Sequence, residues 1–586
     1  MALLDAIQHV GTGPIPSTFG IFVFLAVLYI AYQRLLPQPF PGIPYNKQSA
    51  RSPLGDAPDM FREVRRTREL NVWLAKQVEK LQAPLVQVFV QPFSKPWLLV
   101  ANSVEGQDIL MRRPEFDRSD LITDGMRVLD GFHARFKTGN LTRTNKAWLQ
   151  DLMTPSFLNN IVSPMIYHNS ENLVHFWKTK TRLANGRSFD VHADLDNSAF
   201  DGMLAFMFGR HFKHTALGPQ IDAASKLTAA TVEVGPNGEA KFPNAPFNEF
   251  IEGVYEMVEA IDWAAQSLSP SLATRWFRKT AKYRHVKAVE RRVILQLFRN
   301  GLSSIEATGE AKTAIECMLM RERKAAEKQD REPDYSNQTM IDEACPSIPP
   351  NKAIGGQFIA GLHTTSSTLA FVLIYLTRHP EAQTKLRRAL HRTYSAALAE
   401  NRAPTMAELT KTRVPYLEAV IEETLRLHAT SITRQAIRDT ELLGHHVPKG
   451  TNIIVIANGP GFHAPSLPLD PAMHSATAKL NNNWDESRDM KAFLPERWLV
   501  GAGHDDEGEF DANAALNIAF GLGPRGCWGR RLAYMEMRSI LTLVLWNFDL
   551  LAIEPVLADP KLSYSVVHRA NHCYVKLQAR GEGPVA

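Results

Sequence analysis

One short segment of the sequence places a cysteine where chemistry explains it better than packing does. The segment FGLGPRGCWGRR covers residues 520–531, and Cys527 follows Gly526 and precedes Gly529 by two positions. Glycines free the backbone, so several N–H groups can turn toward one sulfur and stabilise a thiolate, which is a strong ligand for iron. Arg525 supplies a planar guanidinium that suits a carboxylate. A haem meets both needs, because it carries iron at its centre and two propionates at its edge.

The same loop resembles the haem-binding signature FxxGxRxCxG of the cytochrome P450 superfamily, the haem-thiolate monooxygenases. The matching residues are Phe520, Gly523, Arg525, Cys527 and Gly529, and the following helix continues the family pattern with Ala533 and Glu536. The resemblance implies haem b, which is iron protoporphyrin IX, with Cys527 as the axial thiolate ligand of the iron and the other signature residues around the cofactor. On the loop alone, a buried cysteine beside a glycine-rich turn is the alternative.

Two further segments occur upstream of the loop, in the order that the family has them. The ETLR segment gives Glu423 and Arg426, whose i, i+3 spacing puts both side chains on one face of a helix. The PERW segment, residues 495–498, supplies Arg497. Such charge pairs are common on solvated helices, so the pair alone indicates little. Its position upstream of PERW and of the cysteine loop is what supports the resemblance. The resemblance implies a structural triad of these three residues that locks the core behind the haem.

The segment AGLHTT resembles the family's oxygen-binding helix, which we expect from about residue 353 to 378. Thr364 and Thr365 begin a run of five hydroxyl residues, and such side chains can bond to i−4 carbonyls and bend a helix. The resemblance implies that Thr364, with Thr365, forms the oxygen side of the catalytic site. His363 stands in place of the family's usual acid. An imidazole can relay protons near neutral pH, so His363 is predicted to replace the acid. The alternative is that His363 faces solvent or caps a neighbouring group.

Other positions predict how the propionates are held. Trp148 matches the tryptophan of the family's WxxxR motif, and its indole N–H can donate to a propionate. Leu152 occupies the position of the arginine in that motif. Arg434 lies where many members have a basic propionate ligand. We therefore expect Arg525, Trp148 and Arg434 to bind the cofactor's carboxylates.

The resemblance implies an enzyme that uses O2 and two electrons to hydroxylate or otherwise oxidise a lipophilic small molecule, in the style of fungal secondary-metabolism members. The sequence holds no flavin or NADPH motif, so the electrons must come from outside the chain. The resemblance implies an NADPH–cytochrome reductase as the donor, with cytochrome b5 as an optional second donor. Arg525, Arg530, Arg531 and Arg538 are candidates for a basic docking face. Two alternatives stay open: a haem-thiolate isomerase or dehydratase that does not activate O2, and a haem-binding sensor or carrier.

The N-terminal region predicts a membrane anchor. Residues 17–36 read STFGIFVFLAVLYIAYQRLL, about enough to span roughly 30 Å of hydrocarbon as a helix. Arg34 and later arginines follow the apolar run, and the positive-inside rule then puts the body in the cytosol. A cleaved signal peptide is the alternative, but a basic n-region and a small-residue cleavage site are missing. We expect a single-pass anchor in the endoplasmic reticulum membrane within residues 1–36, a proline-rich hinge at 37–48 and a catalytic domain at 49–586.

The bulk composition fits a globular body in a reducing compartment. The chain has 586 residues, a net charge of +5 and four cysteines without a CxxC pair, which argues against nucleic-acid binding, a zinc site and a disulfide framework. Helical periodicity in residues 250–268 and 415–428, with β-rich patches near Val86, Thr451 and the C-terminus, predicts a mainly α fold with small β-sheets. The resemblance makes this the cytochrome P450 fold, with variable substrate contacts in residues 119–136. The charged stretch 321–339 predicts a solvated connection.

Overall fold

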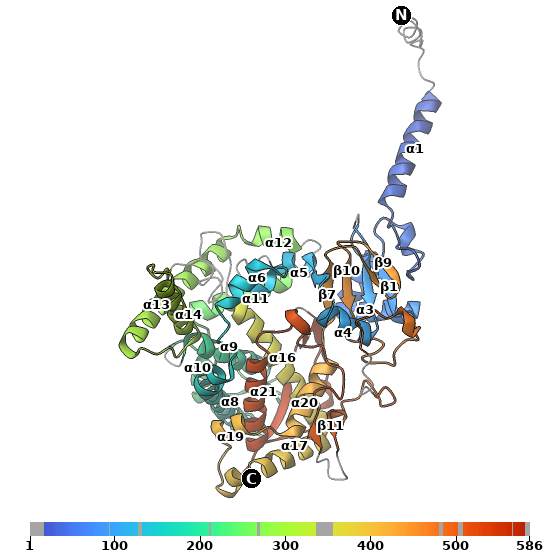
Figure 1. The fold of residues 1–586 in the computed structure, drawn as a ribbon. Coiled ribbons are helices and arrows are strands. Elements are labelled where there is room, and N and C mark those ends of the chain that lie inside the picture. The colour runs from blue at the N-terminus through green and yellow to red at the C-terminus, as the bar shows by residue number, and fades with distance from the viewer. Residues whose placement is uncertain are drawn as a thin grey trace, which may run out of the picture.

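The computed structural model describes residues 17–92, 94–126, 132–209, 212–265, 270–335, 356–479, 485–501, 508–564 and 567–580. Helices dominate the body (Figure 1). The long helices are α1 (Ser17–Leu35), α8 (Ser163–Ala184), α9 (His192–Phe208), α11 (Glu249–Ala265), α13 (Ala281–Thr308), α14 (Ala314–Lys328), α16 (Gly356–Arg378), α17 (Pro380–Thr393), α20 (Pro415–Leu427) and α21 (Arg530–Asn547). The shorter helices are α2 (Ala57–Thr67), α3 (Leu70–Leu81), α4 (Ser103–Met111), α5 (Asp120–Gly125), α6 (Asn140–Ala147), α7 (Pro155–Phe157), α10 (Leu217–Ser225), α12 (Pro270–Phe277), α18 (Ser395–Ala399) and α19 (Met406–Lys411).

Small sheets lie beside these helices. One five-stranded sheet has the order β1-β2-β10-β7-β3, another has the order β13-β16-β4-β6-β5, and β8–β9, β11–β12 and β14–β15 form separate pairs. Their bounds are β1 (Leu85–Val88), β2 (Trp97–Val100), β3 (Phe116–Arg118), β4 (Phe189–Asp190), β5 (Glu233–Val234), β6 (Ala240–Lys241), β7 (Ile432–Ala436), β8 (Thr440–Leu442), β9 (His445–Val447), β10 (Asn452–Val455), β11 (Leu499–Val500), β12 (Glu509–Phe510), β13 (Phe548–Leu551), β14 (Leu562–Tyr564), β15 (His568–Ala570) and β16 (Tyr574–Ala579). The predicted mainly α fold with small sheets is confirmed, and the three predicted β-rich patches form β1, β10 and β16.

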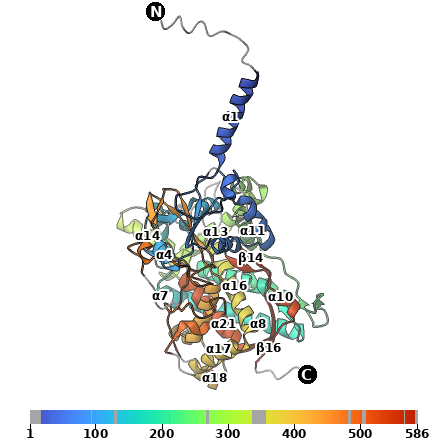
Figure 2. The same cartoon turned by 90° about the vertical axis from the view of Figure 1, so that its right-hand side faces the viewer.

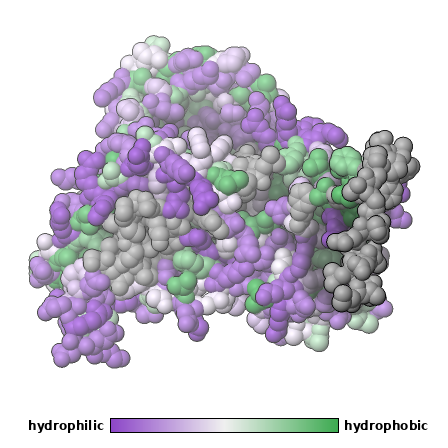
Figure 3. Space-filling model, turned by 90° about the horizontal axis from the view of Figure 1, so that it is seen from above, coloured by the Kyte–Doolittle hydropathy of each residue, from purple (hydrophilic) through white to green (hydrophobic). Residues whose placement is uncertain are grey.

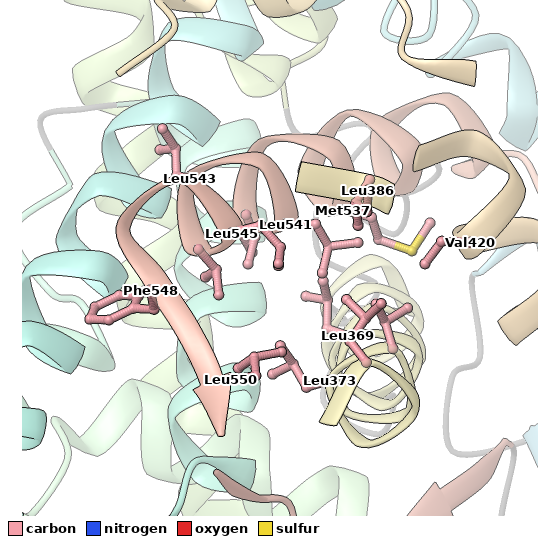
Figure 4. Close-up of a cluster of buried hydrophobic side chains, with 14 of the residues drawn as sticks. Leu369, Leu373, Leu386, Val420, Met537, Leu541, Leu543, Leu545, Phe548 and Leu550 are labelled. Carbon is pink, nitrogen blue, oxygen red and sulfur yellow. The ribbon is translucent and has the colours of Figure 1, made fainter. Parts of the chain in front are cut away.

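The centre of the body is an apolar contact between α16, α20 and α21. Figure 4 shows Leu369 and Leu373 of α16 in one cluster with Met537 and Leu541 of α21 and Val420 of α20. Each of these side chains is at most 1% exposed. Full burial of a side chain of this size stabilises a fold by about 1.5–3 kcal/mol. The cluster therefore fixes the three helices that carry or follow the predicted site residues relative to one another.

The proline-rich segment at 37–48 is bound to the body. The side-chain amide of Gln87, on β1, donates to the carbonyl oxygens of Phe40 at 2.9 Å and Ile43 at 2.7 Å, and its oxygen accepts from the Phe40 N–H at 2.8 Å. Gln87 is fully buried, and Ile43 is 2% exposed. Because a buried amide is costly to leave unpaired, these bonds hold the segment against the sheet.

Helix α1 stands away from the body, as two perpendicular views show (Figures 1 and 2). Among the described residues, its exposed large apolar side chains have exposures of 38–63%, and they are Phe24, Leu25, Val27, Leu28, Tyr29, Ile30, Tyr32 and Leu35. Within the described residues, no helix combines the length and the apolar content needed to cross a membrane. The predicted transmembrane span therefore stays a prediction. The face of the body on this side mixes hydrophilic and hydrophobic surface (Figure 3).

One local expectation is wrong. Residues 321–328 of the charged stretch continue α14 instead of forming a connection. The buried residues of this helix recur at helical spacing, with Leu319, Glu322 and Ala326 on its inner face. The charged residues between them lie outward, and most apolar residues of the helix lie in its first half. The second half therefore shows a high density of charge in the sequence, which is typical of a connection. Residues 336–339 of the stretch lie outside the described part of the chain.

Two neighbouring leucines on β13 test the packing of the core. Leu550 is 5% exposed and belongs to the central cluster, whereas Leu551 is 37% exposed. Leu550→Ala should lower the free energy of unfolding by about 2–5 kcal/mol, because it leaves a cavity. Leu551→Ala should change it by no more than about 0.5 kcal/mol. Urea unfolding followed by circular dichroism measures both, and equal losses would contradict this account.

Candidate active site

Cys527 lies in a tight loop between Phe520 and the first residue of α21, Arg530. The Cys527 N–H donates to the carbonyl oxygen of Phe520 at 2.7 Å. Gly523 has a φ of +65°, and a Cβ at this position would lie 2.5 Å from the carbonyl oxygen of Leu110. Only glycine fits this turn, which presses the loop against the end of α4 and so fixes the place of the sulfur.

The Cys527 thiol is accessible, and the loop directs polar hydrogens toward it. Surrounding protein atoms raise the pKa of the thiol, while bonds from the N–H groups of Gly529 and Arg530 and the charge of the Arg530 guanidinium oppose the rise. The sulfur also precedes the N-terminus of α21, where the helix dipole favours negative charge. Donors of this kind suit a thiolate that binds a metal, because they stabilise its charge and tune its basicity.

Three arginines gather near this loop. Strand β3 pairs with β7 so that Arg118 lies opposite Arg434, and Arg525 comes from the cysteine loop. Burial, together with the charges of neighbouring guanidiniums, lowers the pKa of Arg118 to about 9 and that of Arg434 to about 10. Burial also lowers the pKa of Arg525. Among the described residues, one acid, Asp117, opposes these shifts in all three cases, so three positive charges face one negative charge there and two stay uncompensated.

These arginines fit the two carboxylates of a haem. The buried Nε atoms of Arg118 and Arg525 have no hydrogen-bond partner among the described residues, although Arg525 Nη2 donates to the carbonyl oxygen of Phe136 at 2.7 Å. Two propionates would supply both the missing charge and the missing acceptors. Sequence reasoning missed Arg118, because only the pairing of β3 with β7 brings it beside Arg434. It offers a guanidinium in a chain that has Leu152 at the usual arginine position.

Trp148 and Leu152 belong to the apolar part of the molecule. Trp148 directly follows α6 and packs half-buried against an apolar cluster, and its indole N–H makes no hydrogen bond with the described residues. Leu152 is fully buried in the same cluster. The leucine therefore contributes packing where the family pattern has a charge.

The structure brings Glu423, Arg426 and Arg497 together. Glu423 accepts both Nε and Nη2 of Arg426 at 2.8 Å, Nε of Arg497 at 3.1 Å and the indole N–H of Trp498 at 3.0 Å. Arg426 Nη1 also donates to the carbonyl oxygens of Phe462 and Met490 at 3.0 and 2.9 Å. All members of the triad are at most 7% exposed. Removal of one partner from such a buried network costs about 3–5 kcal/mol, because a charge is left unpaired.

Helix α16 carries the predicted oxygen-side residues. Thr364 Oγ1 donates to the carbonyl oxygen of Ala360 at 2.7 Å, and Thr368 Oγ1 donates to that of Thr364 at 3.0 Å. Bonds of this kind are associated with bending of a helix. Thr364 is half-buried, whereas the neighbouring Thr365 is 4% exposed. Of the two threonines, Thr364 is thus the better placed to meet a ligand.

His363 turns toward helix α9 instead of bulk solvent. Its Nδ1 lies 3.2 Å from Oδ1 of Asp196, and its side chain is 15% exposed. Asp196 is another residue that sequence reasoning missed, since it lies 167 positions away in the chain.

The arginines of α21 are partly neutralised. Arg538 forms an ion pair with the buried Glu418, and Arg531 donates to the carbonyl oxygen of Met153 at 2.9 Å. Arg530 lies 3.6 Å from Glu422 and stacks over the rings of Phe520 and Tyr534. A basic docking face on this side would therefore carry less free charge than the sequence predicts.

Comparisons with known proteins agree with this arrangement. The sequence model of the family Cytochrome P450 matches residues 114–461 and 479–575. The chain belongs to the cytochrome P450 family. The monooxygenase xilC of Penicillium rubens is 37% identical over 569 residues, with 96% of each chain covered. The monooxygenase TRI13 of Fusarium sporotrichioides is 30% identical over 590 residues, covering 95% of this chain and 98% of its own.

This protein is therefore a cytochrome P450 monooxygenase, and the predicted resemblance to fungal members is confirmed. As a member of the family it works with haem iron, O2 and electrons from a redox partner. A solved zebra fish cytochrome P450 in complex with abiraterone has a TM-score of 0.59 at 16% identity, covering 88% of this chain and 100% of that one. That likeness establishes the fold alone.

The arginine group predicts opposite effects on cofactor binding and on the apoprotein. Arg118→Gln should weaken haem binding about 10–100-fold, since a hydrogen bond to a charged group contributes about 1.5–3 kcal/mol. The apoprotein should be no less stable, because one repulsive charge is removed. Haem titration and urea unfolding of the apoprotein measure the two effects. Arg438→Gln, whose side chain is 71% exposed, is the control, and an equal loss of haem in both variants would contradict the assignment.

Proposed function

We propose that this monooxygenase oxidises a lipophilic small molecule of secondary metabolism, with haem b bound through Cys527. The observation that carries the proposal is the accessible Cys527 thiol among N–H donors, beside arginines of which two charges have no counter-charge among the described residues. When bound, the haem supplies the iron at which O2 is reduced and one of its oxygen atoms is transferred to substrate. The chain's own residues hold this group, position the substrate, exclude water and deliver protons.

The proximal residues have distinct roles in this proposal. Cys527 binds the iron, while Phe520, Gly523 and Gly529 shape the loop around it. Arg525, Arg434 and Arg118 bind the propionates, and Trp148 contributes an apolar wall with an N–H at its edge. The triad of Glu423, Arg426 and Arg497 is a structural lock, since its bonds tie α20 to the segments that lead into the cysteine loop.

The oxygen side is proposed to use α16. Thr364 presents its hydroxyl near the substrate and Thr365 supports the helix from its buried side. His363 takes part in proton delivery in place of an acid. An imidazole can give up and regain a proton near neutral pH, which the threonine hydroxyl alone cannot do.

We further propose the partners and the location. An NADPH–cytochrome reductase supplies the electrons, with cytochrome b5 as an optional second donor. Helix α1 attaches the enzyme to the endoplasmic reticulum membrane, with the body in the cytosol. The support for this attachment is that α1 projects from the body with its apolar side chains uncovered. A lipid surface would cover them and would also concentrate lipophilic substrates near the body.

One alternative has a specific observation in its favour. His363 at the acid position also suits a haem-thiolate isomerase or dehydratase that does not activate O2. Oxidation of NADPH by the enzyme with its reductase separates the readings, because the isomerase needs no external electrons. A sensor or carrier would likewise show no NADPH-dependent turnover.

The carbon monoxide difference spectrum of the reduced protein tests the proposed cofactor ligand. A thiolate-bound haem should give a strongly red-shifted Soret band, because the electron-rich sulfur would raise the electron density at the iron. Cys527→His should lose this band while retaining the fold by circular dichroism. Cys573→Ser is a control, since Cys573 is buried away from the loop in the central cluster. A red-shifted band that persists in Cys527→His would rule out this ligand.

Cell fractionation tests the proposed anchor. Leu25→Asp with Leu28→Asp should move the full-length protein from the membrane pellet to the supernatant. Each charge in the bilayer centre costs about 2.5–3.5 kcal/mol. The control is Leu398→Asp, because Leu398 is a surface leucine of the body with 46% exposure, close to the 48% of Leu28. Retention of the double variant in the pellet at high salt would argue against attachment through α1.

A further inference from the structure

Helix α9 brings a buried carboxylate to the position where this chain departs from the family pattern. Asp196 is 6% exposed. Its Oδ1 lies 3.2 Å from Nδ1 of His363 and accepts the Ser366 hydroxyl at 2.5 Å, both from α16. The two helices meet closely because of Gly361, where a Cβ would lie 2.4 Å from the side chain of Met203 on α9. The close approach therefore puts an acid from a different helix onto the imidazole.

Other groups complete the surroundings of Asp196. Arg569 of β15 donates to Oδ2 at 2.5 Å, and Nδ1 of His192, on α9 itself, lies 3.9 Å from the same oxygen. The hydroxyl of Tyr255, on α11, donates to Oδ1 of Asn197 at 2.8 Å; burial raises the pKa of Tyr255 well above its usual value, and the charge of Asp196 adds to the rise. Burial raises the pKa of Asp196, but the bond from His363 and the charges of His363, Arg569 and His192 outweigh it and lower the pKa to about 2. The carboxylate thus stays ionised at working pH.

We propose, building on the role proposed above for His363, that Asp196 is a positioning residue that holds His363 as a proton donor of the reaction. A carboxylate on Nδ1 fixes the tautomer and orientation of an imidazole and favours its protonated form. The opposite nitrogen, Nε2, makes no hydrogen bond with the described residues and is the exchanging position. Nε2 gives its proton to reduced oxygen, the proton leaves in the water that is formed, and a solvent proton then restores the ring.

A second aspartate on α9 provides the contrast. Asp194 is 4% exposed and accepts Lys180 Nζ at 2.8 Å and the indole N–H of Trp177 at 3.0 Å, both from α8. It is a buried, ion-paired acid on the same helix with no partner on α16 among the described residues. Asp194→Asn therefore reproduces the structural cost of removing a buried charge without affecting the imidazole.

The experiment uses the full-length haem-loaded enzyme with its reductase and NADPH, without substrate. It measures the share of NADPH electrons recovered as hydrogen peroxide and the pH profile of that share. Variants enter only after their carbon monoxide difference spectrum matches that of the wild type, so failure of the haem-thiolate proposal is seen separately. Asp196→Asn keeps the acceptor but removes the charge. A slower second proton leaves more oxygen as peroxide, so the peroxide share should rise severalfold.

The pH profile carries the sign of the effect. Proton donors become scarcer as pH increases, so the wild-type peroxide share should rise with pH. Asp196→Asn removes the carboxylate that positions the imidazole, so its peroxide share should exceed that of the wild type across the profile. His363→Gln should abolish the rise, the double variant should match His363→Gln alone, and Asp194→Asn should keep the wild-type profile.

Several outcomes would overturn the proposal. A wild-type profile in Asp196→Asn removes the role of Asp196, and a wild-type profile in His363→Gln removes that of His363. An equal rise of the peroxide share in Asp194→Asn would show a general effect of buried charge on α9. Where Asp196→Asn does not bind haem, Asp196→Glu replaces it, because it keeps the charge and should retain the pH-dependent rise that His363→Gln lacks. Loss of that rise in Asp196→Glu with normal haem would also count against the proposal.

Discussion

The rest of the site depends on the hydrogen bonds that the carboxylate of Glu423 accepts. This carboxylate is fully buried and accepts bonds from Arg426 on its own helix and from Arg497 and Trp498 on a separate segment. Arg426 extends the network to the carbonyl oxygens of Phe462 and Met490, which belong to irregular chain. Irregular segments lack regular backbone bonds of their own, so their position must come from such fixed partners. One buried charge therefore ties α20 to the chain that leads into the cysteine loop.

Two kinds of buried charge occur in the described residues: charges that are paired within the chain, and charges that have no partner within it. Around Glu423 and Asp196, opposite charges meet within hydrogen-bonding distance. Near Cys527, in contrast, three arginines share one aspartate, and two of their Nε atoms lack partners among the described residues. Uncompensated buried charge is expensive, and a folded chain keeps it where a ligand of opposite charge will neutralise it. This contrast supports the proposed place of the cofactor's carboxylates beside these arginines.

Local sequence patterns predicted several elements of the fold, and they erred where burial depends on segments distant in the chain. The periodicity of residues 415–428 corresponds to α20, and the patch near Val86 to β1. The charged end of α14 was predicted to be a connection, because its outward charges mask its inner face. That face is buried by contacts with α13 and α9, which lie elsewhere in the sequence. The proline-rich segment at 37–48 stays a predicted hinge, and the amide of Gln87 binds it to β1. No local pattern in residues 37–48 or around Gln87 predicts this contact.

The sequence by itself determined the chemistry of the site. Three local motifs carry this chemistry: the glycines around Cys527, the ExxR pair and the hydroxyl run of α16. Each motif lies within about ten consecutive residues, so it can be recognised from the sequence alone. Only the tertiary structure decided how charges from distant segments combine. Arg118 meets Arg434 through the register of β3 and β7, and Asp196 meets His363 through the packing of α9 on α16. Electrostatic partnership depends on distance in space, and the strand register and helix packing that set those distances are properties of the folded chain.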